Sequence, residues 1–258
     1  MLNFKDIQTK PLFIAGPCVI EDEKLLKTIA EELVRIKEEH EVNIVFKASF
    51  DKANRTALSS YRGPGISRGL EMLARVKEEF KLPLLTDIHE AHQAEKAAAV
   101  VDILQIPAFL CRQTDLLKAA ADTGKIVNIK KAQFLSGLDM EYPLNKVVQS
   151  GNNQVMLTER GNMYGYNNLV VDFRNIPDMK SFGYPVIMDC THSVQRPGGA
   201  EGKTGGNREF VPSMALAAKA FGADGYFIET HPNPDAGKSD AANMLELSNL
   251  ESLIKSLL

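Results

Sequence analysis

The sequence predicts a single (β/α)8 (TIM) barrel. Eight short apolar runs recur along the 258 residues, and they are continuously apolar instead of alternating, as expected of parallel strands covered on both faces. Eight strand–helix units in about 250 residues match such a barrel in number and size. A doubly wound open sheet is the structural alternative. We expect one catalytic domain over residues 1–258, with residues 1–10 as an extension that covers the barrel.

The predicted strands are, in chain order, 11–18, 43–49, 82–89, 101–107, 125–131, 153–160, 185–192 and 224–231. Two intervening stretches have the apolar spacing of amphipathic helices: Leu26, Ile29, Ala30 and Leu33 in one, and Ile66, Leu70, Leu73 and Phe80 in the other. A third helix, within 112–124, ends at Gly124, a typical C-cap. The longest irregular stretches, 50–65 and 193–207, each follow a strand and are expected to be functional loops.

Composition argues against several classes of protein. The net charge of −3 gives no general attraction to nucleic acid or to an anionic membrane. No run approaches the roughly 20 apolar residues of a membrane span, and the N-terminus lacks the apolar core of a signal peptide. Cys18, Cys111 and Cys190 form neither a disulfide framework nor a CxxC pair. We therefore expect a cytoplasmic, reduced protein.

Every predicted strand ends in polar or ionisable side chains. These are Cys18; Lys47 and Ser49; Asp87 and His89; Gln105; Lys130 and Lys131; Glu159 and Arg160; Asp189 and His192; Glu229 and His231. A solvated loop residue would explain any one of them. Because active sites of such barrels lie at the carboxyl ends of the strands, all eight together predict one polar mouth and hence an enzyme.

The predicted mouth is rich in cations although the chain is net acidic. Six of them lie on or just beyond strand ends: Lys47, Lys52, Arg55, Arg112, Lys130 and Arg160. Lysine and arginine at such positions suit phosphates and carboxylates, which arginine can bind through two nitrogens at once. We expect a small substrate with several negative charges.

A possible metal site involves Cys18, His192, Glu229 and Asp240. A thiolate, an imidazole and two carboxylates can bind Zn²⁺, Fe²⁺ or Mn²⁺. These residues belong to the first, seventh and eighth strand units, which adjoin only if the barrel closes. Taken singly, Cys18 could equally be a packing residue, as we expect for Cys111 and Cys190. No organic cofactor is predicted.

Motifs along almost the whole chain, from Leu12 to the C-terminus, resemble those of the 3-deoxy-D-manno-octulosonate 8-phosphate synthase family. They are IAGPCVIE, FKASFDKANRTALSSYRGPG, LLTDIHE, LQIPAFLCRQTDLL, NIKKAQF, LTERGNMYGYNNLVVDFR, DCTHSVQRPGG and FIETHPNPDAGKSD. The related 3-deoxy-heptulosonate 7-phosphate synthase, which uses erythrose 4-phosphate, typically carries Pro-Arg-Thr where this chain has KANRTA. That enzyme is the main alternative, and the ANR sequence best separates the two.

The resemblance implies condensation of phosphoenolpyruvate with arabinose 5-phosphate and water, with release of inorganic phosphate. It implies that Lys130, Arg160 and the Ala108 backbone hold the phosphoenolpyruvate phosphate, and Lys47, Lys52 and Gln105 its carboxylate end. The other substrate-binding residues it implies are Ser49, Asn54, Arg55, Thr56 and Arg112. Asp87, Lys130, Arg160, His192 and Asp240 are the expected catalytic residues. Many relatives have two serines after the arginine, where this chain has Thr56 and Ala57, so one phosphate-binding hydroxyl is absent.

The resemblance also bears on the metal and on assembly. Family members with cysteine at the position of Cys18 depend on a metal, whereas those with asparagine there do not. In the first class Cys18, His192, Glu229 and Asp240 would be the ligands. Arg112 is expected to reach the sugar phosphate of a neighbouring subunit, which implies a homotetramer. The product would enter lipopolysaccharide synthesis.

Two other functions fit the architecture. One is a Schiff-base aldolase with Lys130 or Lys131 as the nucleophile, which borohydride would trap with substrate. The other is a barrel that binds sugar phosphates without catalysis, which would leave the thiolate, imidazole and carboxylate set without a role.

Overall fold

Eight parallel strands form a closed barrel in the computed structural model, which describes residues 3–200 and 203–258. The barrel strands are β1 (Leu12–Gly16), β2 (Asn43–Lys47), β3 (Leu84–Asp87), β4 (Ile103–Ile106), β5 (Ile126–Lys130), β6 (Val155–Glu159), β9 (Val186–Asp189) and β12 (Gly225–His231). The ring closes because β12 pairs with β1, with Leu12 opposite Gly225. The predicted (β/α)8 barrel is confirmed, and the alternative of an open sheet is wrong.

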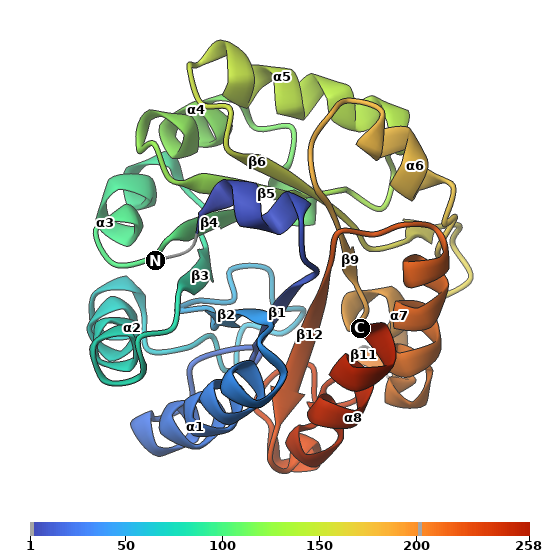
Figure 1. Ribbon diagram of the computed structural model, residues 1–258. Helices are drawn as coiled ribbons and strands as arrows, with labels where there is room; N and C mark the ends of the chain where they lie inside the picture. The colour runs from blue at the N-terminus through green and yellow to red at the C-terminus, as the bar shows by residue number, and fades with distance from the viewer. Residues whose placement is uncertain (1–2, 201–202) are drawn as a thin grey trace.

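The helices form an outer ring around the strands (Figure 1). They are α1 (Glu23–His40), α2 (Ile66–Phe80), α3 (Ala94–Ala98), α4 (Thr114–Asp122), α5 (Glu141–Gln149), α6 (Asn175–Lys180), α7 (Val211–Ala220) and α8 (Leu247–Leu257). α1 begins after Asp22, whose side chain accepts a hydrogen bond from the Leu25 amide at 2.8 Å. The apolar faces predicted for α1 and α2 pack against the strands. Gly124 follows α4 with φ of 68°, the conformation expected after a helix end.

Two apolar layers hold the barrel together. Residues alternate along each strand, so Phe13 and Ala15 of β1 face the helices, whereas Leu12 and Ile14 fill the barrel interior. Ile7, in a short 3-10 helix η1 (Phe4–Gln8), packs into this interior cluster and is only 1% exposed. The segment before β1 therefore contributes a core residue.

Several short elements decorate the loops after the strands. They are η2 (Ala91–Gln93), η3 (Ala108–Leu110), η4 (Leu138–Met140), β7 (Asn162–Met163), β8 (Leu169–Val170), η5 (His192–Val194), β10 (Gln195–Ala200), β11 (Lys203–Gly206), η6 (Arg208–Phe210), η7 (Pro234–Ala236) and β13 (Leu245–Glu246). Antiparallel pairing of β10 with β11 gives the stretch 193–207 more structure than the sequence predicts. Its glycines and polar residues carry no alternating apolar pattern from which a strand could be predicted.

Among the described residues, none of the helices combines the length and the hydrophobicity needed to cross a membrane.

Candidate active site

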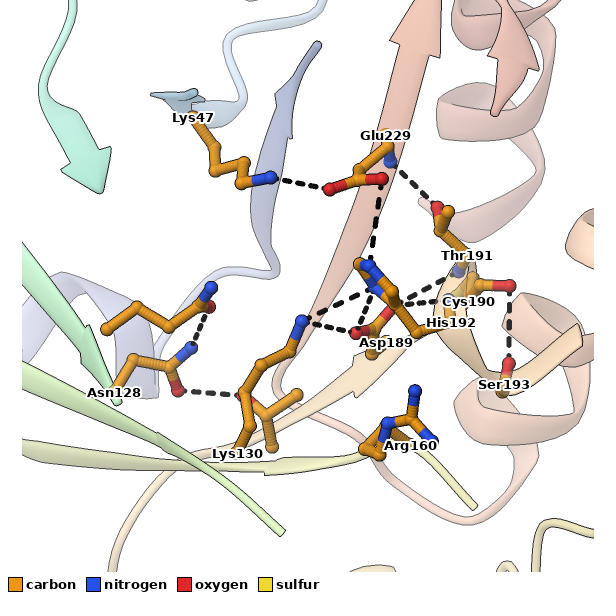
Figure 2. A network of polar contacts seen from close by, with 12 residues as sticks. Lys47, Asn128, Lys130, Arg160, Asp189, Cys190, Thr191, His192, Ser193 and Glu229 are labelled. Carbon is orange, nitrogen blue, oxygen red and sulfur yellow. Dashed lines mark hydrogen bonds and ion pairs between the residues drawn. The ribbon is translucent and has the colours of Figure 1, made fainter. Parts of the chain in front are cut away.

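A layer of buried polar side chains lies at the carboxyl ends of the barrel strands. Of the residues predicted from the sequence, the structure brings together in this layer Cys18, Lys47, Ser49, Lys52, Asp87, Gln105, Lys130, Arg160, His192, Glu229 and Asp240. Charges are almost never fully buried unless they are paired or bind a ligand. Figure 2 shows part of this layer, with Lys47 and Glu229 on one side and Lys130, Asp189 and His192 on the other.

Gly16 and Pro17 place Cys18 in the layer. Gly16 has φ of 152°, and a Cβ at this position would lie 2.0 Å from the carbonyl oxygen of Lys47. Only glycine permits this approach of β1 to β2. The chain then turns so that the ammonium of Lys47 donates a hydrogen bond of 2.9 Å to the carbonyl of Cys18, whose thiol points toward Asp240.

Cys18, Glu229 and Asp240 form a compact group of potential metal ligands. One ligand atom from each lies within 4.8 Å of the others, and the Cys18 sulfur is 3.2 Å from Oδ2 of Asp240. Nε2 of His192 is 3.7 Å from carboxylate oxygens of both Glu229 and Asp240. Oε2 of Glu229 is buried and has no hydrogen-bond partner within residues 3–200 and 203–258, which is costly unless a cation or proton meets it. These donors fit a divalent transition metal.

The protonation of this group depends on nearby charges. Burial raises the pKa of the Cys18 thiol well above its usual value, and the charge of Glu229 adds to this rise. Burial alone would raise the pKa of Glu229 too, but Lys47 and His192 hold it below its usual value. Burial would also raise the pKa of Asp240, but His192 and Lys52 hold it well below its usual range. The set is therefore a protonated thiol beside two carboxylates, and a bound cation would favour the thiolate.

Lys130 and Arg160 form a cationic corner beside the potential metal ligands. Nζ of Lys130 pairs with Asp189 at 2.6 Å and lies 4.0 Å above the ring of Phe227. Nη2 of Arg160 donates to the side-chain oxygen of Gln195 at 3.0 Å, whereas its Nη1 is buried and has no hydrogen-bond partner in the part of the chain that the structure describes. Burial lowers the pKa of this guanidinium. A buried, unpartnered nitrogen on a cation is what an anion-binding site requires.

A chain of hydrogen bonds crosses four strands and holds Asp87. Ser49 donates to one oxygen of Asp87 at 2.5 Å, and the Gln105 amide donates to the other. Asn128 then donates to Gln105 at 2.9 Å, and Thr158 to Asn128 at 2.7 Å. Burial alone would raise the pKa of Asp87, but Lys52 and Lys47 hold it well below its usual range. Asp87 is therefore an ionised carboxylate in a fixed position.

Sequence reasoning missed Asn128, Thr158, Gln195 and Ser239. Asn128 precedes Lys130 by two positions and so lies on the same face of its strand, a signal that was present in KIVNIKK. Ser239 had no such signal, because its contacts with Cys18, at 3.1 Å, and with Arg55 depend on the folded loop after β12.

The 50–65 loop carries the residues expected at the sugar phosphate. Nη1 of Arg55 donates to the Ser239 hydroxyl at 2.7 Å, so this loop is tied to the loop after β12. Lys52 is 3.8 Å from Asp87 and 3.9 Å from Glu229. Asn54 and Thr56 are exposed on the same loop. Ala108 opens η3 and is 9% exposed.

Two predicted cations lie apart from this layer. Arg112 is exposed, and among the described residues its side chain forms no hydrogen bond or ion pair. Lys131 is fully buried and points away from Lys130: Nζ donates to the Leu135 carbonyl and to the Asn162 side chain, each at 3.0 Å. A lysine so enclosed presents no amine to a substrate.

Residues 5–257 match the family model for the DAHP synthetase I family. The chain belongs to this family. The chain is also similar to proteins named 2-dehydro-3-deoxyphosphooctonate aldolase. The protein of Synechococcus sp. is 56% identical over 243 residues, covering 94% of this chain and 86% of that protein. The protein of Geobacter metallireducens is 53% identical over 256 residues, covering 99% and 94%.

A third relative with the same name, from Cyanothece sp., is 53% identical over 245 residues, or 95% of this chain and 90% of that protein. This name is a synonym of 3-deoxy-D-manno-octulosonate 8-phosphate synthase, so the resemblance predicted from the motifs is confirmed within the DAHP synthetase I family. Cys111 and Cys190 are buried free thiols outside the site.

Proposed function

We propose that this chain condenses phosphoenolpyruvate with D-arabinose 5-phosphate and water to form 3-deoxy-D-manno-octulosonate 8-phosphate and inorganic phosphate. The observation that carries the proposal is the buried cationic corner of Lys130 and Arg160, with Nη1 of Arg160 unpartnered, in a chain of this family. The names of its relatives favour this activity over the condensation with erythrose 4-phosphate. Cytoplasmic synthesis of a lipopolysaccharide precursor follows from the same proposal.

Lys130, Arg160 and the Ala108 backbone would bind the phosphate of phosphoenolpyruvate. Lys47, Lys52 and Gln105 would bind its carboxylate end. The ammonium of Lys47 donates to Glu229 and to the Cys18 carbonyl, which leaves one of its three hydrogens for substrate. Asn54, Arg55 and Thr56 would bind arabinose 5-phosphate from the 50–65 loop.

The residues favour the reaction by position and charge. Two polyanions must be brought together, and the cations of the site offset their repulsion. C3 of phosphoenolpyruvate attacks the aldehyde while water adds to C2, and the resulting tetrahedral intermediate loses phosphate. Asp87 lies ionised near the reacting atoms, and Lys130 and Arg160 stabilise the charge on the departing phosphate.

Cys18, His192, Glu229 and Asp240 would hold a divalent metal such as Zn²⁺, Fe²⁺ or Mn²⁺, and the chain would then belong to the metal-dependent class. Support comes from the compact Cys18, Glu229 and Asp240 group and from the partnerless oxygen of Glu229. When bound, such an ion would polarise and orient the aldehyde.

A second copy of this chain would complete the site through Arg112. This arginine is exposed. Phe109, three residues before it, is 54% exposed, and Phe134 and Leu138 after β5 are each 58% exposed. Exposed apolar side chains of this size are typical of a surface that a partner covers. A homotetramer is the assembly we propose.

Phosphate release tests the function. Enzyme stripped by chelator should release no phosphate from phosphoenolpyruvate with arabinose 5-phosphate, and Zn²⁺, Fe²⁺ or Mn²⁺ should restore release. Erythrose 4-phosphate should be a poor substitute, and borohydride should trap no lysine.

A pair of variants tests the metal site. Cys18→Ser should bind the metal more weakly than the natural protein does. Cys190→Ser, the matched change at another buried thiol, should bind it with unchanged affinity. Full activity in stripped, metal-free enzyme would contradict the metal assignment but not the condensation.

A further inference from the structure

We propose that Asp189 is a positioning residue that orients His192 and Lys130 together and so links the metal ligands to the phosphate corner. The inference rests on the proposed function, which identifies the metal ion and phosphoenolpyruvate as what these two groups of residues bind. Asp189 ends β9 and is fully buried, and it acts on the proposed sites only through its contacts with His192 and Lys130. It belongs to the motif DCTHSVQRPGG, which also contains His192 and Gln195, the partner of Arg160.

The carboxylate of Asp189 has a partner in every direction. Oδ1 accepts hydrogen bonds from the backbone amides of Thr191, at 3.1 Å, and His192, at 2.8 Å. Oδ2 lies 2.8 Å from Nδ1 of His192 and 2.6 Å from Nζ of Lys130. Figure 2 shows both contacts converging on Asp189. A carboxylate offers about four acceptor sites, so this one is saturated by the turn and by two side chains of the site.

This contact sets the tautomer of His192. An ionised carboxylate only accepts hydrogen bonds, so its 2.8 Å contact favours a hydrogen on Nδ1 of His192 over the longer contact of 3.4 Å, in which Nδ1 would accept from Lys130. Nε2 then points toward Glu229 and Asp240, 3.7 Å from each. In the neutral ring its lone pair is free, which is the form that binds a metal. Asp189 thereby fixes both the angle and the proton of the imidazole.

The same oxygen holds Lys130. Its ammonium lies between Oδ2 of Asp189 and the ring of Phe227, 4.0 Å from the ring centre. An unbranched lysine chain has several rotamers, and this pair of contacts selects one that faces the mouth. Without the carboxylate we expect Lys130 to move away from the phosphate.

Asp189→Asn tests the inference because its size is nearly unchanged. Its Oδ1 can still accept from the turn amides, but its Nδ2 donates, so His192 would carry its hydrogen on Nε2 and Lys130 would lose its acceptor. We expect Zn²⁺ affinity, measured by competition with a chromophoric chelator, to fall about 10–100-fold. Phosphoenolpyruvate affinity of the metal-stripped protein, measured by calorimetry, should fall at least about fivefold, a loss we assign to the charge-assisted contact.

Two control variants separate positioning from general damage. Cys190→Ala alters a neighbouring buried side chain and should lower thermal stability while leaving both affinities unchanged. His192→Gln should lower Zn²⁺ affinity but leave phosphoenolpyruvate binding to the stripped protein intact. If Asp189→Asn retains both affinities within about twofold while it folds, the inference is overturned.

A measurement on the unaltered protein covers the case in which Asp189→Asn fails to fold. Nitrogen-15 NMR of the stripped protein reports the tautomer of each of its five histidines, and His192→Gln assigns the signal. We expect the Nδ1–H form, and an Nε2–H form would overturn the inference. None of these readouts requires turnover, so a failure of phosphate release would count against the proposed function alone.

Discussion

The buried guanidinium of Arg160 has different surroundings at each of its two terminal nitrogens. Arg160 is only 4% exposed, and its Nη2 has a partner in Gln195, whereas its Nη1 is buried without one among the described residues. A buried donor without a partner costs about 1–3 kcal/mol, more when charged. Such a cost is retained where a ligand removes it, and phosphate, with its several acceptor oxygens, suits this fork.

Arg160→Lys keeps the charge but removes the second donor. We expect KM for phosphoenolpyruvate to rise about 10–100-fold, the equivalent of a lost charge-assisted hydrogen bond. Steady-state phosphate release at saturating arabinose 5-phosphate measures this, and Arg174→Lys, an exposed arginine paired with Asp172, is the control. Near-normal kinetics of Arg160→Lys would remove Arg160 from the phosphate site.

The last helix is joined to the first by a cluster of charges. Glu251 of α8 lies 2.5 Å from Arg35 of α1 and 3.0 Å from His40, and it also pairs with Lys255 at 2.6 Å. Hydrogen bonds from Lys255, Arg35 and His40 lower the pKa of Glu251 to about 2. This contact helps to hold α8 against α1 where the ring of helices closes.

Glu251→Gln should therefore have a pH-dependent effect on stability. Because the folded pKa of about 2 lies below the usual value of 4.5, the contribution is complete above pH 4.5 and disappears as pH falls through 2. Glu251 and its three partners lie near the surface, so we expect the Tm of Glu251→Gln at pH 7 to be lower by no more than about 2 °C. Thermal melts of Glu251→Gln and of the exposed control Glu38→Gln should converge toward low pH; a constant difference would contradict the assignment.

Within a single chain, Arg112 does not reach the site where we predicted that it binds the sugar phosphate. Arg112 lies on the surface, apart from the polar layer to which Lys47, Lys52, Lys130 and Arg160 contribute. If it acts in the site of a neighbouring copy, two defects carried by different chains can complement each other.

Co-expression of Arg112→Ala with Asp87→Asn tests this arrangement. Each variant alone should be nearly inactive. Random mixing gives hybrid assemblies in which about one quarter of the sites have both natural residues, so about that share of activity should return. Light scattering would give the size of the assembly. No recovery in demonstrably mixed assemblies would show that Arg112 does not act across an interface.

Much of the site was predictable from the chain because strand ends are easy to locate. Lys47, Asp87, Lys130, Arg160 and Glu229 each follow a buried apolar run, and the barrel topology alone directs them to one mouth. Arg112 follows such a run as well, yet it lies outside the layer within one chain. Position after a strand predicts the end of the barrel, but it does not predict where a long side chain in a loop points.

The sequence by itself determined the barrel, its polar mouth and, through its motifs, the family. These depend on local periodicity and on residue types at strand ends, which short-range patterns record. Only the tertiary structure decided which potential metal ligands and which charged side chains lie close together. Pairing of β1 with β12 places Gly16 opposite Glu229, and the loop after β12 then brings Asp240 to Cys18 across 222 residues. Strand alternation separates Lys130 from Lys131, because successive side chains point to opposite faces and only one faces the mouth.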